Sequence, residues 1–130
     1  MKLMVGYNGS PASKRALDLA CQDALKSDAE VLVVSSMMGG SSEHIEDIQK
    51  VQDMLDEARK MLARQQVKND VVQLVRGLSP GEDIVKYAED NEIDHIYLGI
   101  EKKSRTRKIL LGSTAQYIIL KGPCPVTTIK

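Results

Sequence analysis

The sequence contains no phenylalanine and no tryptophan, and its only aromatic residues are four tyrosines that form no cluster. Proteins that bind single-stranded nucleic acid stack bases on aromatic side chains, so this class has little support here. The 18 basic and 18 acidic residues give a net charge of zero. A dedicated nucleic-acid binder normally carries a basic excess, so we expect no nucleic-acid partner.

Two cysteines, Cys21 and Cys124, are too few for a disulfide framework and have no metal-ligand spacing. Cys21 shares a helical stripe with Leu17 and Ala24, which predicts a small buried core residue. The N-terminal segment "MKLMVGYNGS" has a short apolar run broken by glycine, unlike a signal peptide or a membrane span. These absences favour a cytoplasmic protein that does not associate with membranes.

Motifs that would identify a reaction are also missing. The sequence has no GxxxxGK[ST], HExxH or CxxC pattern, and neither His44 nor His95 is paired with a nucleophile or carboxylate motif. We therefore expect no catalytic residues and no metal site, which favours a binding or regulatory protein over a dedicated enzyme.

Strand-like and helix-like segments alternate along all 130 residues. Expected strands span 2–8, 29–38, 70–77, 93–99 and 125–129, and expected helices span 11–26, 45–66, 79–91 and 113–122. Ser10 before Pro11 predicts the first helix start, because serine caps the helix and proline suits its first position. Alternating βα units predict a single doubly wound α/β domain over residues 1–130, with a parallel sheet covered on both faces.

Ligands of open parallel sheets bind beyond the carboxyl ends of the strands. Three loops follow strands there: "YNGS", "SSMMGG" and "GIEKKSRTRK". The third leads to a helix that begins with Gly112-Ser113, where Ser113 and Gln116 match a capping box. Its first N–H groups, those of Ser113, Thr114 and Ala115, would form an anion site. The alternative is that Gly112-Ser113 is only a helix cap.

These segments, in this order, resemble the universal stress protein family. "VGYNGSPAS" is similar to the family's first strand and turn, "RGLSPGEDIVKYAED" to its third-helix entry, and "PCPVTTI" to its final strand. In the family's ATP-binding branch a glycine is followed, after two residues, by a second glycine and, after nine more, by Gly-Ser or Gly-Thr. Gly99, Lys102 and Gly112-Ser113 match this spacing, with lysine in place of the second glycine.

The resemblance implies strand order 3-2-1-4-5 and an ATP or related adenine-nucleotide site, with or without Mg²⁺. The family's first strand usually ends in aspartate, where this chain has Asn8. An amide still accepts and donates hydrogen bonds but carries no charge. Lys102 begins a run with five basic residues in seven, and its ammonium could bind phosphate in place of backbone donors. The candidate nucleotide-binding residues are Gly6, Tyr7, Asn8, Ser36, Gly99, Lys102, Gly112, Ser113 and Thr114.

Three functions remain open. The first is an adenine-nucleotide-binding regulator of the stress response, for which slow ATP hydrolysis is not ruled out by the sequence. The second is a nucleotide-free family member that acts as a dimeric interaction module. The third is an enzyme of the adenine-nucleotide α-hydrolase-like fold, although "NGSPAS" lacks the expected "SGGxDS" pattern. With the family's strand order, the last strand is an exposed edge. It predicts a homodimer through Val126, Thr127, Thr128 and Ile129.

Overall fold

The computed structural model describes residues 1–37, 45–75, 78–100 and 111–130. Its elements follow one another as β1 (Lys2–Gly6), α1 (Pro11–Ser27), β2 (Glu30–Met37), α2 (Ile45–Arg64), β3 (Asn69–Val75), α3 (Pro80–Asp90), β4 (His95–Gly99), α4 (Ser113–Lys121) and β5 (Val126–Ile129). The five strands form one sheet in the order β3-β2-β1-β4-β5, and every neighbouring pair is parallel. The predicted fold class and strand order are confirmed.

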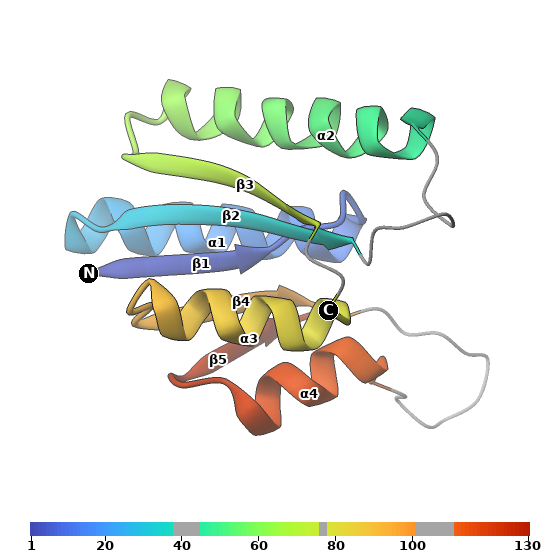
Figure 1. The fold of residues 1–130 in the computed structure, drawn as a ribbon. Coiled ribbons are helices and arrows are strands. Elements are labelled where there is room, and N and C mark those ends of the chain that lie inside the picture. Colours follow the sequence, from blue (N-terminus) through green and yellow to red (C-terminus); the bar gives the residue numbers. More distant parts are fainter. Residues whose placement is uncertain (38–44, 76–77, 101–110) are drawn as a thin grey trace.

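Helices cover both faces of the sheet (Figure 1). Alternate residues of β1 point to opposite faces: Leu3 and Val5 pack under α1 and α2, whereas Met4 packs under α3 and α4. The same alternation holds in β2, where Val33 and Val34 belong to different core clusters. Burial on both faces explains why these strands are continuously apolar in sequence.

The helix start at Ser10 is confirmed. Ser10 has extended backbone angles, and its Oγ accepts a hydrogen bond of 3.1 Å from the Ser13 N–H, while Pro11 takes the first helical position. The helix ends where Asp28 turns into the left-handed region and its N–H bonds to the Ala24 carbonyl. Cys21 lies in this helix and is buried, as predicted. These local contacts fix the direction in which α1 leaves the sheet.

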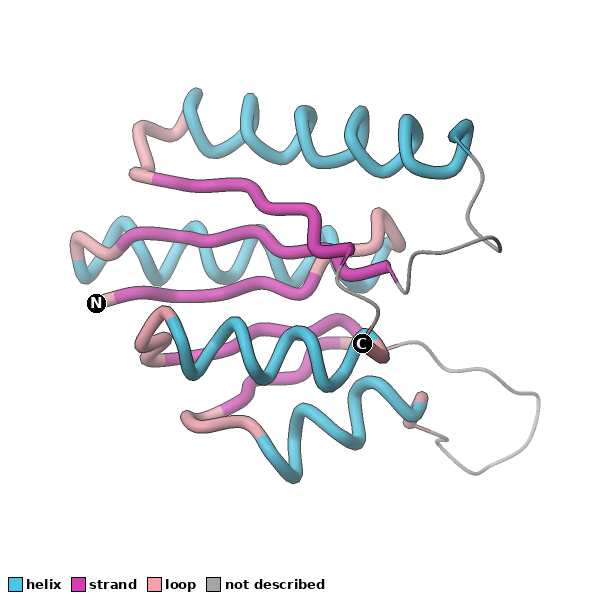
Figure 2. The backbone as a smooth tube through the Cα atoms, viewed as in Figure 1, coloured by secondary structure: helices cyan, strands magenta, loops and turns pink. Residues whose placement is uncertain are grey.

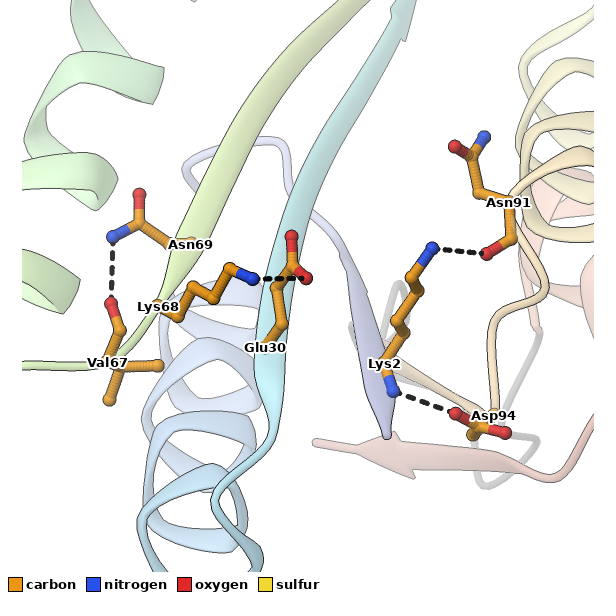
Figure 3. Close-up of polar contacts among 7 residues, drawn as sticks. All are labelled: Lys2, Glu30, Val67, Lys68, Asn69, Asn91 and Asp94. Atoms are coloured by element: carbon orange, nitrogen blue, oxygen red, sulfur yellow. Dashed lines mark hydrogen bonds and ion pairs between the residues drawn. The ribbon is translucent and has the colours of Figure 1, made fainter.

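Polar contacts connect the loops at the amino edge of the sheet (Figure 3). The Lys2 backbone N–H donates to the Asp94 carboxylate over 2.7 Å, and the Lys2 ammonium donates to the Asn91 carbonyl over 3.2 Å. On the other side of β1, Lys68 Nζ lies 3.8 Å from the Glu30 carboxylate. Figure 2 shows that the chain begins at this edge, and because all neighbouring strands are parallel, all five run away from it. The strands end at the opposite edge, where ligands of open parallel sheets bind.

Candidate functional site

A cavity of about 360 Å³ lies beyond the carboxyl ends of β1, β2 and β4. Its lining comes from the ends of these strands and from the first turns of α1, α3 and α4. The lining residues are Gly6, Tyr7, Asn8, Ser10, Ser13, Val34, Ser35, Ser36, Pro80, Ile84, Leu98, Gly99, Ile100, Gly112, Ser113, Thr114, Ala115 and Ile118. Eight of the nine candidate residues are among them, and Lys102 lies outside the described residues. The structure thus brings together residues from four separate segments of the chain.

A second cavity, of about 440 Å³, lies at the amino edge between the ends of α1 and α2. It is larger, but the Lys68–Glu30 ion pair joins two of its lining residues. In open parallel sheets, ligands bind where the strands end rather than where they begin. The carboxyl-edge cavity is therefore the better candidate site.

The turn after β1 forms one wall of this cavity. Asn8 Oδ1 accepts a 3.0 Å hydrogen bond from the Ser10 N–H, which is an Asx turn. Gly9 adopts φ 78°, in the left-handed region that glycine enters without strain. The sequence predicts a strand through Asn8, but β1 ends at Gly6 because Asn8 is the first residue of the Asx turn. Asn8 therefore presents mainly its amide Nδ2 to a ligand.

Tyr7 lines the cavity, yet its side chain belongs to the buried core beneath α1 and α2. Its backbone N–H donates to the Val34 carbonyl over 2.9 Å, which extends the pairing of β1 with β2. Burial raises the pKa of the Tyr7 hydroxyl, and the nearby Glu57 and Asp18 raise it further. The Tyr7 hydroxyl is therefore neutral at physiological pH, and Tyr7 contributes packing but no charge to the cavity wall.

Gly99 ends β4 directly against the first turn of α1. A Cβ placed on Gly99 would lie 2.3 Å from the Ala12 carbonyl carbon and 2.3 Å from the Ser13 nitrogen. Both are backbone atoms, so no side-chain rotation could relieve the overlap. This glycine has a packing role: it lets the strand and the helix start approach closely on the cavity wall.

Gly112 is in a different situation. It is the N-cap of α4 with φ −62° and ψ 156°, angles open to any residue, and a Cβ there would meet no described heavy atom within 4 Å. Neither backbone conformation nor packing within the described chain requires glycine at this position. Gly112 also lines the cavity.

The predicted capping box at the start of α4 is wrong. The N-cap is Gly112 rather than Ser113, and the Gln116 side chain donates instead to the Leu111 carbonyl over 2.7 Å. The first intrahelical bond joins the Gln116 N–H to the Gly112 carbonyl. Within the described residues no side chain caps the helix, so the N–H groups of Ser113 and Thr114 remain available at the cavity.

Ser36 stands at the end of β2, on the face covered by α3. Its hydroxyl donates a 3.0 Å hydrogen bond to Oδ2 of Asp83, a residue of α3 with no exposed surface. Ser36 was predicted from the sequence, but Asp83 was not, because it is 47 residues away and carries no local signal. The apolar part of the wall was missed as well: Val34, Ile84, Leu98 and Ile118 line the same cavity.

Of the two histidines, only His95 lies among the residues that the structure describes. His95 does not line the cavity; its Nε2 lies 2.6 Å from the Thr127 hydroxyl, and its ring stacks on Tyr97 with centroids 4.7 Å apart. His44 lies outside the described residues. Among residues whose placement is described, no three His, Cys, Asp or Glu side chains gather as a metal site. No helix in the described ranges is long and apolar enough to cross a membrane.

Comparison with known proteins decides the family. The universal stress protein family model matches residues 1–130. The chain belongs to this family. The universal stress protein MJ0531 of Methanocaldococcus jannaschii is 33% identical over 99% of this chain and 81% of its own length.

Two solved family members have the same fold. A universal stress protein from Archaeoglobus fulgidus gives a TM-score of 0.85 at 32% identity, covering 99% of this chain and 91% of the other. A structure of the universal stress protein from the same organism in complex with dAMP gives 0.82 at 30% identity, covering 99% and 95%. The second of these structures contains dAMP, an adenine nucleotide.

Proposed function

We propose that this chain is an adenine-nucleotide-binding regulatory protein of the universal stress type. The observation that carries the proposal is the carboxyl-edge cavity, in which the uncapped start of α4 faces open space at Gly112. A helix N-terminus combines free N–H donors with the positive end of the helix dipole, which suits phosphate. The dAMP complex of the Archaeoglobus fulgidus relative adds support.

The proposed binding mode assigns the phosphates to the N–H groups of Ser113 and Thr114, beside Gly112. The base would lie on the apolar part of the lining, against Val34 and Leu98. Ligand pockets typically combine an apolar lining with a few placed polar groups, and this cavity has both. Asn8 would offer its amide Nδ2 to the ribose or the purine edge.

Lys102 extends the proposal from AMP to ATP. In the sequence it follows Gly99 by three residues and precedes Gly112, the N-cap of α4, by ten. An ammonium from this loop would bind a β- or γ-phosphate, with or without Mg²⁺. We propose regulation rather than catalysis as the role of the site, because its polar lining holds no base paired with a nucleophile in the described part of the chain.

The direct test is to identify what the purified protein carries and binds. Mass spectrometry under native conditions should detect an adenine nucleotide, and calorimetry with ATP, ADP, AMP and cyclic AMP should give saturable binding. Gly112→Val should abolish that binding without unfolding the protein, because its Cβ meets open space. Wild-type affinity in a folded Gly112→Val variant would refute the assignment of phosphate to this helix start.

A homodimer is the second proposal, and a nucleotide-free dimeric module is the alternative function. β5 lies at the end of the sheet and pairs with β4 alone, so its outer backbone groups have no strand partner among the described residues. Leu120 in the neighbouring α4 is 78% exposed. Antiparallel pairing of Val126–Ile129 with a second copy would satisfy the edge and cover apolar surface.

A further inference from the structure

The Ser36–Asp83 pair sits at one end of the cavity, opposite the start of α4. β4 precedes α4 in the chain, Ser36 is the penultimate residue of β2, and β1 lies between these two strands. Strands in a sheet lie about 4.8 Å apart, so the two ends are separated by roughly 10 Å. If phosphate occupies the α4 end, as the proposed function requires, the β2 end receives the base.

Asp83 controls which atom of the Ser36 hydroxyl faces that base. A hydroxyl has one proton to donate, and here it is donated to the Asp83 carboxylate over 3.0 Å. Asp83 has no exposed surface, so water cannot replace this donor. Loss of a partner to a buried carboxylate is costly, which holds the hydroxyl in one orientation. With its proton donated to Asp83, the Ser36 oxygen has only lone pairs left for a ligand in the cavity that Ser36 lines.

A hydroxyl that can only accept selects a ligand that donates. Val34 and Ile84, which also line the cavity, offer no hydrogen bond to a base, so the Ser36 oxygen would discriminate between bases by what they donate. The 6-amino group of adenine donates hydrogen bonds, whereas the 6-oxo group of hypoxanthine or guanine accepts them. AMP and IMP have the same sugar and phosphate and differ at this edge of the base.

We propose that Asp83 is a positioning residue that makes Ser36 an obligate acceptor, and that this pair selects 6-aminopurine over 6-oxopurine nucleotides. This inference rests on the proposed function, because it needs a nucleotide in the cavity. Beyond the proposed function, it assigns the preference for adenine to Ser36 and Asp83. Asp83 lies in α3, has no exposed surface and does not line the cavity, so it acts through Ser36.

The test is the ratio of the AMP and IMP affinities, measured by calorimetry on the full-length chain. The wild type should bind AMP about tenfold more tightly than IMP, since the Ser36 oxygen and the 6-oxo group of IMP are both acceptors and cannot form a hydrogen bond. Asp83→Asn should reduce the ratio to about one, because the amide can donate to Ser36 and free its proton for the 6-oxo group. Ser36→Ala should also reduce the ratio to about one by removing the acceptor, and circular dichroism should establish that both variants are folded before their ratios are compared.

Ser113→Ala is the matched control, because it makes the same side-chain change at the phosphate end. Its AMP-to-IMP ratio should remain that of the wild type. A wild type that binds both nucleotides equally, or a folded Asp83→Asn variant that keeps the wild-type ratio, would overturn the inference and leave the proposed function intact. A wild type that binds neither nucleotide would overturn the proposed function and this inference together.

Discussion

Replacing Gly99 by alanine should destabilise the fold, although Gly99 lies on the cavity wall. The new Cβ would lie 2.3 Å from two backbone atoms of Ala12 and Ser13, whereas ordinary contacts begin at 3.4 Å, so the overlap is about 1.1 Å. Side chains cannot yield here, so β4 or the first turn of α1 must move. One of the two atoms is the Ser13 nitrogen, which donates to the Ser10 cap.

Overpacking a tight site typically costs about 1–3 kcal/mol, and a disturbed N-cap adds about 1 kcal/mol. We take about 3 kcal/mol as the expected loss, a large part of the 5–15 kcal/mol that holds a typical domain together. For a chain of this length that corresponds to a fall in Tm of roughly 10 °C. Thermal unfolding followed by circular dichroism measures it.

Gly112→Ala is the control, because it inserts the same methyl group where a Cβ meets no described atom within 4 Å. Its Tm should stay within about 2 °C of the wild type, since its backbone angles suit alanine. The reasoning fails if Gly99→Ala unfolds at the wild-type temperature, or if Gly112→Ala is the less stable variant. Either result would mean that the fold does not require glycine at position 99 more than at position 112.

Three further predictions concern the basic loop, the sheet edge and a buried tyrosine. Lys102→Ala should weaken ATP binding about ten- to a hundredfold and AMP binding far less, because AMP lacks the outer phosphates. Equal ATP affinities in wild type, Lys102→Ala and Lys102→Gly would show that Lys102 neither contacts phosphate nor blocks the nucleotide pocket. Light scattering at micromolar concentration should give twice the chain mass of 14.3 kDa, and a monomer mass would end the dimer proposal. Burial and a 2.6 Å hydrogen bond to Asp23 raise the pKa of Tyr97 in the fold. Above the ordinary tyrosine pKa of about 10 the unfolded chain loses this proton first, so the free energy of unfolding should fall with rising pH, and less steeply in Tyr97→Phe. The free energy of unfolding is measured by urea titration at several pH values, and the same dependence on pH in the two proteins would contradict this.

The sequence predicted the fold well because its signals are local. Continuous apolar strands and the Ser10-Pro11 helix start mark elements within a few residues, and all nine expected elements were found. The strand order came from the family resemblance rather than from periodicity. Periodicity identifies the buried face of an element but does not determine which element packs against it.

The candidate site was predicted less completely because its contacts are distant in sequence. Gly99 was chosen for its spacing in a glycine pattern, and only the packing of β4 on α1 reveals its structural role. Asp83 was missed because nothing near it in the sequence points to Ser36. The cap of α4 was misplaced by one residue because Gln116 bonds to Leu111, a choice that a Ser-x-x-Gln pattern does not reveal.

The measurement that tests the central claim most directly is a nucleotide titration followed by amide NMR. As ATP is added, the resonances of Ser113 and Thr114 should shift and saturate together with those of Gly6 and Asn8, because all four line one cavity. The amides of Gln66 and Val67 at the amino-edge cavity should not move. Saturable shifts confined to the amino edge, or none at millimolar ATP, would contradict the assignment of an adenine-nucleotide site to the carboxyl edge.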